Sequence, residues 1–478
     1  MCASTVLKRV NISLVSRSHR IPPTFKATRY HQRAANAMTS FDFQSHLRSI
    51  DPASSYHVAK LPGGLVNLTS RASKTTEKNV GTFPEASSLV LKYAPPFVAA
   101  IGPAAPFSTK RQEIEASALR LFYDDGPLAG VSERAGIRVP KVLHHAVDSS
   151  VLIMEDLGPL VTLWDLLSPH TLVDNTLTED RITEIGRALG GRVGEFFAAL
   201  HSADTVKRIK DRAKHSRVVE TAVQHLSHSL TRPLIFDAAV APIRQRLDTE
   251  DVEELYARIL EDFSRDNFPG EDCFALGDCH PGAVLLPDWD HLAKNGSEEK
   301  TTTVAVIDWE FSGLADRGVN GDIAQLLACL HCHLIYLEAL LESTTGIISV
   351  DGQETSTKAS NVRKALAATN AFVRGICTRY AEATKLDDIS YSSSASVARL
   401  LRSAVILFGR ETINQAYEFE WDLEGYLEVS RDELRDKMVA AGAEYVRRAG
   451  RDASEALRTW SSGTENRGII SMLFEISR

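Results

Sequence analysis

Two short segments carry acidic side chains that could act together in one reaction. GDCHPGAVLL begins at Gly277 and contains Asp278, and VIDWEFSG begins at Val306 and contains Asp308 and Glu310. Phosphoryl transfer requires one carboxylate to orient the attacking hydroxyl and another to hold Mg²⁺ against the phosphates of the donor. Asp278 fits the first role and Asp308 the second. Glu310 would lie on the same side of an extended segment as Asp308 and could add a metal ligand.

The spacing of the two segments is more informative than either segment alone. Gly-Asp and Asp-x-Glu are common sequences, and each by itself is typical of a solvated turn. Here the apolar runs FALGDCHPGAVLL and TTVAVID, separated by a polar insert, predict a hairpin with loops at its ends. One hairpin would bring Asp278 and Asp308 close together.

Upstream, a glycine pair and a lysine could contact an anion. Gly63 and Gly64 lie in a strand-turn-strand pattern, where backbone N–H groups can approach a phosphate, although Pro-Gly-Gly is first of all a turn. Lys92 lies in the apolar run LVLKYA, and a lysine on a buried strand requires an anionic partner. A nucleotide phosphate could serve, or a carboxylate of the next helix, Glu115 or less favourably Glu113. The alternative is an edge-strand lysine whose amine reaches water.

The elements that must position these residues change character near Leu157. Before it the pattern predicts short strands and one helix, in STKRQEIEASALRLFYDD, and after it the pattern is mostly helical except for the hairpin. We therefore predict an α+β fold with a small, β-rich part at 42–156 and a large, mostly helical part at 157–478.

Polar and glycine-rich stretches of the sequence predict loops in three places and a closely packed helix in another. The stretches 73–88, 292–302 and 346–360 are rich in Gly, Ser or Thr, and we predict loops there. The glycines of LGGRVGEF lie in a helical pattern with no strand before them. That context favours close helix packing over a nucleotide-binding turn.

The bulk composition argues against some classes of partner. The chain has 62 acidic and 54 basic side chains, so a broad electrostatic footprint for nucleic acid or an anionic membrane is not expected. The apolar stretch that begins at Leu326 is interrupted by histidines and a glutamate, which indicates a core helix. Six cysteines in a chain without a secretory signal predict reduced thiols and a cytoplasmic protein. The oligomeric state stays open.

The first 41 residues form a basic leader with no acidic residue. This composition predicts a segment outside the catalytic fold. It is either a disordered tail, with initiation at Met38 as one form of that reading, or a transit peptide that would direct the protein to mitochondria.

Taken together and in order, five features resemble the aminoglycoside phosphotransferase and choline-kinase-like superfamily, and most closely its methylthioribose kinase branch. They are GGLVNLTSRA, LVLKYAPPFVAAIG, RQEIEASAL, VLIMEDLG and the two acidic segments, the second followed by GDIAQLLA. The resemblance spans 56–327. It implies a bilobal protein-kinase-like fold, with an ATP-binding N-lobe at 42–156 and a C-lobe at 157–478 that carries the catalytic loop and the acceptor-binding helices. It also implies an ATP- and Mg²⁺-dependent transfer to a hydroxyl group of a small molecule.

The resemblance also implies roles for individual residues in the N-lobe. The ATP-binding set would be Gly63, Gly64, Asn67, Lys92, Glu115, Met154, Glu155 and Leu157. Lys92 would contact the phosphates and pair with Glu115. The backbone at Glu155 and Leu157, beside Met154, would bind adenine.

In the C-lobe the resemblance implies Asp278 as the base that orients the hydroxyl. Asp308 and Glu310 would hold Mg²⁺, Asp322 would brace the catalytic loop, and His280 would have a supporting role.

Two departures from the superfamily pattern bear on activity. Leu276 replaces a usual histidine, and Ala283 replaces a usual metal-binding asparagine. An alanine methyl cannot coordinate a hard cation, although Glu310 could compensate. We therefore predict a phosphotransferase acting on a sugar, an amino alcohol or an aminoglycoside-like molecule. The alternative is a pseudokinase that binds nucleotide or a partner without turnover.

The acceptor is poorly specified by the sequence. Methylthioribose kinases hold their sugar with an arginine pair on a C-terminal helix, and the nearest stretch here is FGRETINQAYEF. It offers Arg410, but Asn414 and Gln415 stand about where that pair would fall. This placement predicts another hydroxyl compound as acceptor.

Overall fold

The computed structural model describes most of the chain after the leader. The described residues are 41–62, 64–77, 79–123, 126–172, 177–227, 234–266, 272–295, 302–346, 352–386, 395–419, 421–423, 429–453, 455 and 469–474. Gly63 and residues 1–40 of the predicted leader lie outside them. The predicted phosphate contact of Gly63 and the predicted location in the cytoplasm or in mitochondria therefore stay predictions.

The described residues form two compact units. The first contains those up to Gln112 together with Leu143–Asp156, and the second contains Glu113–Val142 and those from Leu157 onward. The first unit thus differs from the predicted N-lobe at 42–156. The reason is that residues 113–142 pack with the helical part of the chain. Within the second unit, α5 (Val131–Ala135) lies against α7 (Glu179–Leu200), and β4 (Ile137–Arg138) pairs parallel with β10 (Val304–Val306).

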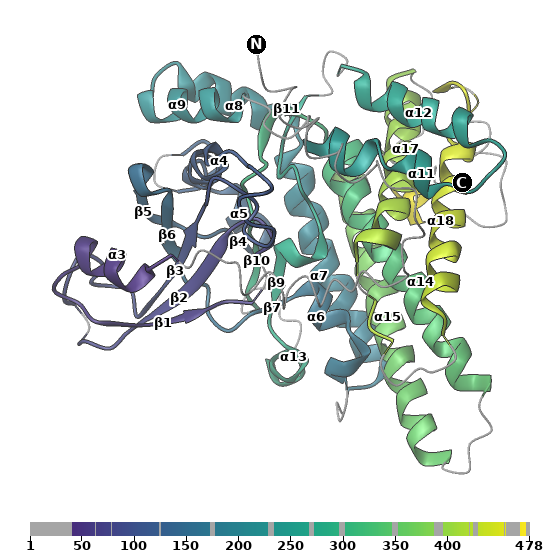
Figure 1. The fold of residues 1–478 in the computed structure, drawn as a ribbon, viewed down its shortest axis with the longest axis horizontal. Helices are drawn as coiled ribbons and strands as arrows, with labels where there is room; N and C mark the ends of the chain where they lie inside the picture. Colours follow the sequence, from purple (N-terminus) through teal and green to yellow (C-terminus); the bar gives the residue numbers. More distant parts are fainter. Residues whose placement is uncertain are drawn as a thin grey trace. The chain divides into compact units, whose positions relative to one another are not determined.

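The first unit is built on a five-stranded sheet with the order β1-β2-β3-β6-β5 (Figure 1). The strands are β1 (Tyr56–Lys60), β2 (Leu68–Lys74), β3 (Ser88–Tyr93), β6 (Val151–Glu155) and β5 (Val142–Ala146). The pairs β1–β2, β2–β3 and β3–β6 are antiparallel. The prediction of short strands before Leu157 is therefore confirmed.

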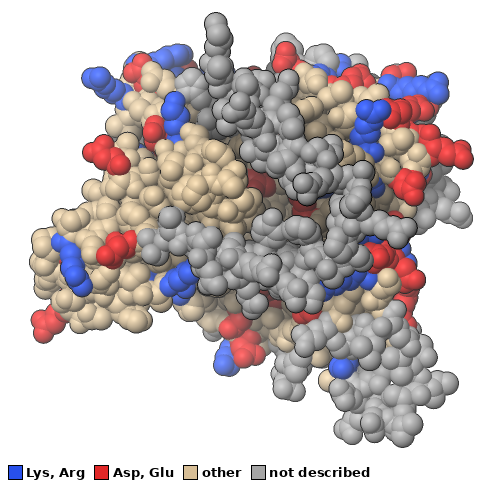
Figure 2. Space-filling view, viewed as in Figure 1, with Lys and Arg blue, Asp and Glu red and all other residues tan. Residues whose placement is uncertain are grey.

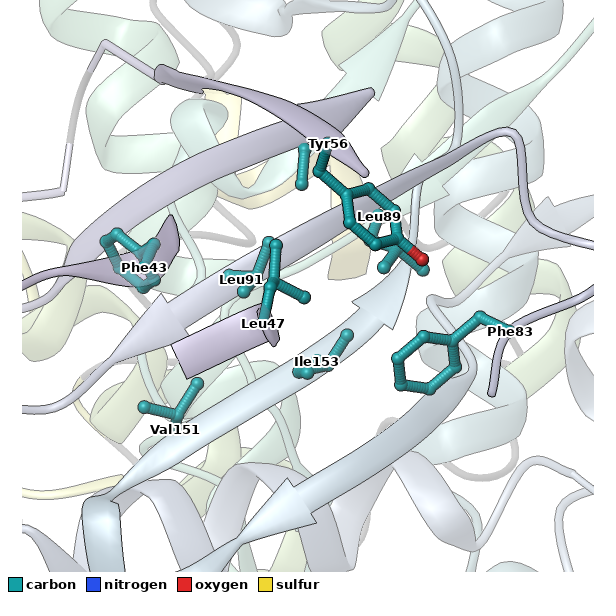
Figure 3. Packing of buried hydrophobic residues seen from close by; sticks show 9 residues of the cluster. Phe43, Leu47, Tyr56, Phe83, Leu89, Leu91, Val151 and Ile153 are labelled. Carbon is teal, nitrogen blue, oxygen red and sulfur yellow. The ribbon is translucent and has the colours of Figure 1, made fainter. Parts of the chain in front are cut away.

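A short helix, α3 (Phe43–Ile50), covers one face of this sheet and was not predicted. Asp42 caps it by accepting a hydrogen bond from the backbone N–H of Ser45 at 2.9 Å. Phe43 and Leu47 are buried against the sheet (Figure 3). The whole cluster comprises Phe43, Leu47, Tyr56, Ala72, Phe83, Leu89, Leu91, Val151 and Ile153.

The second unit is mostly helical. Its long helices α7, α14 (Ala324–Gly346), α15 (Gly352–Thr384), α17 (Ala395–Glu418) and α18 (Arg431–Arg448) pack in the pairs α7–α15, α14–α15, α14–α17 and α17–α18 (Figure 1). The other helices assigned wholly to this unit are α6 (Leu163–Leu167), η2 (Pro169–Leu172), α8 (Ala203–Ala213), α9 (Arg217–Leu226), η3 (Phe236–Val240), α11 (Ile243–Arg246), α12 (Val252–Ser264), η4 (Pro281–Ala283), α13 (Trp289–Asn295), η5 (Gly318–Ile323) and η6 (Ile469–Phe474). Helix α4 (Lys110–Arg120) begins in the first unit and continues into the second, and η1 (Val147–Ser149) belongs to the first.

Two of the predicted loops were wrong in part. Helix α15 begins at Gly352, inside the stretch 346–360, because its polar first turns lead directly into the buried face that starts with Ala359 and Val362. Helix α13 occupies the start of 292–302. Its Trp289 is buried and donates a hydrogen bond to the carbonyl of Leu166 at 2.7 Å, which anchors the helix.

The glycines of α7 permit close packing on α15, as predicted. A Cβ atom built on Gly190 would overlap the carbonyl oxygen of Phe372, and one built on Gly194 would lie 2.5 Å from the carbonyl oxygen of Ile376. Reciprocally, Gly375 of α15 faces the backbone of Arg187. The two helix backbones are therefore in contact through these glycines.

The long apolar helical stretch Gly318–Thr344 has the length and composition of a membrane span, alone among the described residues. However, 78% of its most apolar window is buried within the protein, as expected of a core helix. On the face drawn in Figure 2, acidic and basic side chains of the described residues are interspersed.

Candidate active site

Two short strand ladders position the acidic loops in the second unit. β8 (Cys273–Ala275) pairs antiparallel with β11 (Gly313–Asp316), and β9 (Val284–Leu286) pairs antiparallel with β10. The single predicted hairpin is therefore two ladders, with loop 276–283 between β8 and β9 and loop 307–312 between β10 and β11. β9 also pairs with β7 (Val161–Thr162).

The two loops also contact each other directly. The backbone N–H of Ile307 donates to the carbonyl of Ala283 at 2.9 Å, and the hydroxyl of Ser312 donates to the carbonyl of Leu276 at 3.3 Å. These contacts hold the segment that carries Asp278 against the segment that carries Asp308.

Asp322 braces the first loop, which confirms its predicted role. Its carboxylate accepts hydrogen bonds from the backbone N–H groups of Leu276 at 2.7 Å and Gly277 at 2.9 Å. The same carboxylate lies 3.1 Å from Nε2 of His201, whose Nδ1 lies 3.0 Å from the hydroxyl of Tyr380. All of these groups are at least half-buried, so the brace is part of the core of the unit.

Gly277 is required by the backbone of this loop. Its φ of +89° is in the region that L side chains rarely adopt, and a Cβ atom would overlap the carbonyl oxygen of Phe311. The glycine therefore allows the two acidic loops to approach each other.

Asp278 is held by a residue that the sequence did not indicate. Nε2 of Gln325 donates to Oδ1 of Asp278 at 2.6 Å, and Oε1 of Gln325 accepts from the backbone N–H of Cys279 at 3.2 Å. Gln325 lies in the first turn of α14, three positions after Asp322. That spacing is the signal that could have revealed it, because residues three apart share one face of a helix.

Burial raises the pKa of Asp278 above its ordinary value. The nearby carboxylates of Glu411 and Glu310 raise it further, whereas His280 and the hydrogen bond from Gln325 lower it. A carboxylate with a raised pKa is a better proton acceptor for a hydroxyl group.

The second loop presents two carboxylates on a fixed backbone. Asp308 has a φ of +61°, a left-handed conformation that is uncommon outside glycine and typical of functional sites. The next residue, Trp309, is fully buried, stacks on Phe274 at 6.0 Å between ring centroids and donates to the carbonyl of Val306 at 3.1 Å. The buried indole of Trp309 thus fixes the loop. Asp308 and Glu310 are the residues directly before and after it.

These two carboxylates suit a hard cation that also binds ligands outside the protein, such as phosphate and water. Among the described residues no group of three or more His, Cys, Asp or Glu side chains could hold a metal ion. Mg²⁺ commonly binds through one or two carboxylates together with phosphates and water, which Asp308 and Glu310 fit. Ala283 is fully buried and offers only its carbonyl, which already accepts from Ile307.

In the first unit, Gly64 and Asn67 form a tight turn. Gly64 has a φ of +79°, and a Cβ atom there would lie 2.7 Å from the carbonyl oxygen of Asn67. Oδ1 of Asn67 accepts from Nε of the buried Arg111 at 2.9 Å, and Arg111 also donates to the carbonyl of Pro95 at 2.7 Å. The side chain of Asn67 therefore holds the start of α4, while its predicted contact with ATP stays a prediction.

The other predicted ATP-binding residues lie on several elements. Lys92 on β3 is buried, and its carbonyl accepts from the side chain of Gln112 at 2.6 Å. Met154 is buried at the end of β6, with Glu155 after it. Glu115, which is buried on α4, and Leu157 belong to the second unit. The ion pair between Lys92 and Glu115 stays a prediction.

An aromatic cluster lies beside the catalytic loop and was not predicted. It comprises Trp164, His333, Tyr336, Phe419 and Trp421. Trp164 stacks on Phe419 at 4.6 Å, and Phe419 lies 4.7 Å from Trp421. Trp164 also faces Gly282 of the catalytic loop, 3.7 Å from where a Cβ atom would be. The string YEFEWD after α17 was the available sequence signal.

Two glutamates of α17 add negative charge near Asp278. Glu411 is buried and pairs with Arg410, and Glu418 pairs with Arg246 at 3.1 Å. Burial and the Glu411 carboxylate raise the pKa of Glu418 to about 7, and Asp278 contributes to the same shift. Arg246 also donates to Oδ1 of Asn414 at 2.6 Å.

A cavity of about 460 Å³ opens in the second unit beside the same loops. Its lining includes Gly277, Phe311, Gln325 and Arg410. Space for a small molecule is therefore available next to the groups that hold Asp278.

A β-rich unit, a helical unit and paired acidic loops are typical of phosphotransferases. Residues 89–328, just over half of the chain, match the phosphotransferase enzyme family (APH). The chain belongs to this family and has its protein-kinase-like α+β fold, as predicted.

Individual relatives are more distant. The chain is 26% identical over 260 residues to the 4-hydroxytryptamine kinase of Psilocybe cyanescens and 24% identical over 255 residues to that of Psilocybe cubensis. Each match covers 53% of this chain and 62% of the relative, so the chain spans less than two thirds of either relative. A solved ethanolamine kinase of Plasmodium vivax superposes with a TM-score of 0.39 at 11% identity, over 93% of this chain and 95% of its own.

Proposed function

We propose that this chain is an ATP-dependent phosphotransferase that phosphorylates a hydroxyl group of a small molecule. The observation that carries the proposal is the arrangement around Asp278. Its loop is braced by Asp322 and held against the loop that carries Asp308 and Glu310. Membership of the phosphotransferase enzyme family supports the same reaction.

The residues of the second unit would divide the chemistry between them. Asp278 orients the acceptor hydroxyl and accepts its proton as the oxygen attacks the γ-phosphorus. Asp308 and Glu310 hold Mg²⁺, which supplies charge stabilisation on the phosphates when it is bound. Gln325 and Asp322 act through the loop and do not touch the reacting atoms.

The residues of the first unit would contribute to nucleotide binding. Gly63 and Gly64 bring backbone N–H groups to the phosphates, and Lys92 adds a positive charge that burial makes costly without an anion. The backbone at Glu155, beside Met154, and that at Leu157 bind adenine.

We further propose that the acceptor is a hydroxyl compound that also carries an amine. The aromatic cluster and the partly exposed carboxylate of Glu418 suit an ammonium group, since cations bind over aromatic rings and near carboxylates. The names of the two Psilocybe relatives describe a substrate with an amine and an aromatic hydroxyl. Arg410 is already bound to Glu411, which does not favour the arginine pair of the methylthioribose kinase branch.

An acceptor panel tests this proposal. ATP consumption would be measured with 4-hydroxytryptamine, small amino alcohols, sugars and aminoglycosides, with and without Mg²⁺, and compared with Asp278→Asn. We expect Mg²⁺-dependent consumption with one or more amines and its loss in the variant. Tight binding of Mg·ATP without consumption on any acceptor would support the pseudokinase, and Ala283 would then be its cause.

A further inference from the structure

We propose that Gln325 is the positioning residue for Asp278, so that the first turn of α14 sets the orientation of the catalytic carboxylate. This inference rests on the proposed phosphotransferase function. It assigns a role to a residue of the segment GDIAQLLA for which the sequence resemblance implied none.

Both ends of the Gln325 amide form hydrogen bonds with the catalytic loop. Nε2 donates to Oδ1 of Asp278 at 2.6 Å, and Oε1 accepts from the N–H of Cys279 at 3.2 Å. The amide is planar, so these two contacts fix the direction in which Nε2 points. The carboxylate is therefore held relative to its own backbone.

Residues of the first turn of α14 and of the turn before it contact successive residues of the loop. Asp322 binds the N–H groups of Leu276 and Gly277, and Gln325 binds Asp278 and Cys279. Two residues three positions apart thus hold four consecutive loop residues. A site built on a helix in this way is more precisely placed than one built on a loop alone.

The loop itself has apolar side chains at two positions where a polar group could have stabilised it. Leu276 and Ala283 are both fully buried, so neither can orient a carboxylate. The charged groups that influence Asp278 are His280, which favours its ionised form, and Glu411 and Glu310, which oppose it. A neutral donor such as Gln325 stabilises the carboxylate without adding a competing charge.

The geometry has a direct chemical consequence. With Oδ1 bound to Gln325, Oδ2 is the oxygen that can face the acceptor. As the hydroxyl oxygen forms its bond to the γ-phosphorus, the bond from that phosphorus to the ADP oxygen breaks, and the hydroxyl proton passes to Oδ2. A carboxylate that rotates freely would hold this geometry for a smaller fraction of the time.

Gln325→Met in the full chain tests the inference, because methionine keeps the size of the side chain and removes both hydrogen bonds. Gln245→Met, at an exposed position of the same unit, is the matched control. With Mg·ATP and 4-hydroxytryptamine, we expect kcat to fall by about tenfold or more while KM for ATP changes by less than about twofold. Hydrolysis of ATP per phosphoryl transfer should rise, because a misplaced base discriminates less well against water.

Several outcomes would overturn the inference. An unchanged kcat in Gln325→Met would do so. A lower kcat with an unchanged ratio of hydrolysis to transfer would also do so, because a smaller folded fraction lowers both rates equally and leaves their ratio unchanged. If Asp278→Asn is inactive while Gln325→Met is normal, only this inference fails. If Asp278→Asn keeps full turnover, the proposed role of Asp278 fails with it, and if the wild type phosphorylates no acceptor of the panel, the proposed function fails.

A readout that needs no turnover complements the kinetics and also serves if 4-hydroxytryptamine is not an acceptor. Thermal unfolding would be compared for Gln325→Met, Asp278→Asn and the double variant. Residues in contact give shifts that do not add, so non-additive shifts support the contact. Additive shifts would contradict it. If Gln325→Met does not fold, Gln325→Glu serves in both experiments, because it keeps the size but replaces the donor to Asp278 with a carboxylate.

Discussion

Asp278 has opposite effects on stability and on the proposed chemistry. Because burial raises its pKa, the ionised carboxylate costs folding free energy at neutral pH, and Asp278→Asn removes that cost. We expect the variant to unfold at the same or a higher temperature than the wild type at pH 7.5. Its turnover should fall by at least about a hundredfold.

The pH dependence of this stability difference gives a sharper test. Between the ordinary pKa of an aspartate and the raised pKa of Asp278, the folded state retains a proton that the unfolded state has released, so stability falls as the pH rises. The advantage of Asp278→Asn should therefore grow with pH and disappear in acid. Thermal unfolding across this range measures it, and a pH-independent loss of stability in the variant would contradict it.

Asp308 has a left-handed backbone conformation and carries a proposed metal-binding carboxylate. Different substitutions at this position separate the two properties. Asparagine and glycine tolerate its φ of +61°, whereas alanine in that region costs about 1–2 kcal/mol. We therefore expect Asp308→Asn and Asp308→Gly to be more stable than Asp308→Ala in chemical denaturation. Calorimetry should show that all three bind ATP more weakly in the presence of Mg²⁺. Full Mg²⁺-dependent affinity in any of them would remove Asp308 as a ligand.

Glu418 should affect an amine acceptor more than a neutral one. Because its pKa is about 7, the side chain gains negative charge as the pH rises from 6 to 8, which should lower KM for an ammonium-bearing acceptor. Glu418→Gln should abolish that trend and raise KM at pH 8 by about fivefold or less, since the group is partly exposed. Glu382→Gln on α15 is the control. An equal change in KM for an uncharged hydroxyl compound would contradict a charge-specific role.

At the residue scale, the sequence predicted the residues that belong to short motifs. It missed contacts that form only when distant parts of the chain fold together. Asp278, Asp308 and Asp322 were identifiable because each lies in a short segment of recognisable composition. Gln325 lies in the same segment as Asp322, but its role was missed because it depends on the turn of α14 that faces loop 276–283. The side chain of Asn67 shows the converse: the phosphate loop was recognised, but its contact with Arg111 depends on folding.

At the scale of elements, the packing of α7 on α15 can be tested with two neighbouring glycines. A Cβ atom at Gly190 would overlap the carbonyl of Phe372, so Gly190→Ala should destabilise the chain by about 1–3 kcal/mol. Gly191→Ala is the matched control. Its Cβ atom would lie 3.1 Å from Cγ of Arg379, a flexible side chain, and alanine favours the helix by up to about 1 kcal/mol. Denaturant unfolding of both variants measures the difference, and equal effects would contradict backbone contact at Gly190.

The order of elements was largely predictable, whereas their pairing was not. Periodicity located the strands of the first unit and the long helices of the second. It could not show that β8 pairs with β11 and β9 with β10, because both arrangements have the same apolar runs. It also missed α3, whose Phe43 and Leu47 supply only a short apolar face.

At the scale of the whole molecule, the sequence predicted the class of fold but not the division of the chain. Residues 113–142 include most of the predicted N-lobe helix STKRQEIEASALRLFYDD, yet β4 pairs with β10 and the stretch belongs to the second unit. Such a long-range strand pair leaves no local signal. The acceptor was equally hidden, since the aromatic cluster joins residues from α6, α14 and the segment after α17.

The most direct test of the proposed phosphotransferase activity is detection of the phosphorylated product by ³¹P NMR. The full chain would be incubated with Mg·ATP and the best amine acceptor of the panel, beside Asp278→Asn and a reaction without Mg²⁺. We expect a phosphate monoester signal in the complete wild-type reaction and no such signal in the other two. Formation of orthophosphate alone, or an equal monoester signal with Asp278→Asn, would contradict it.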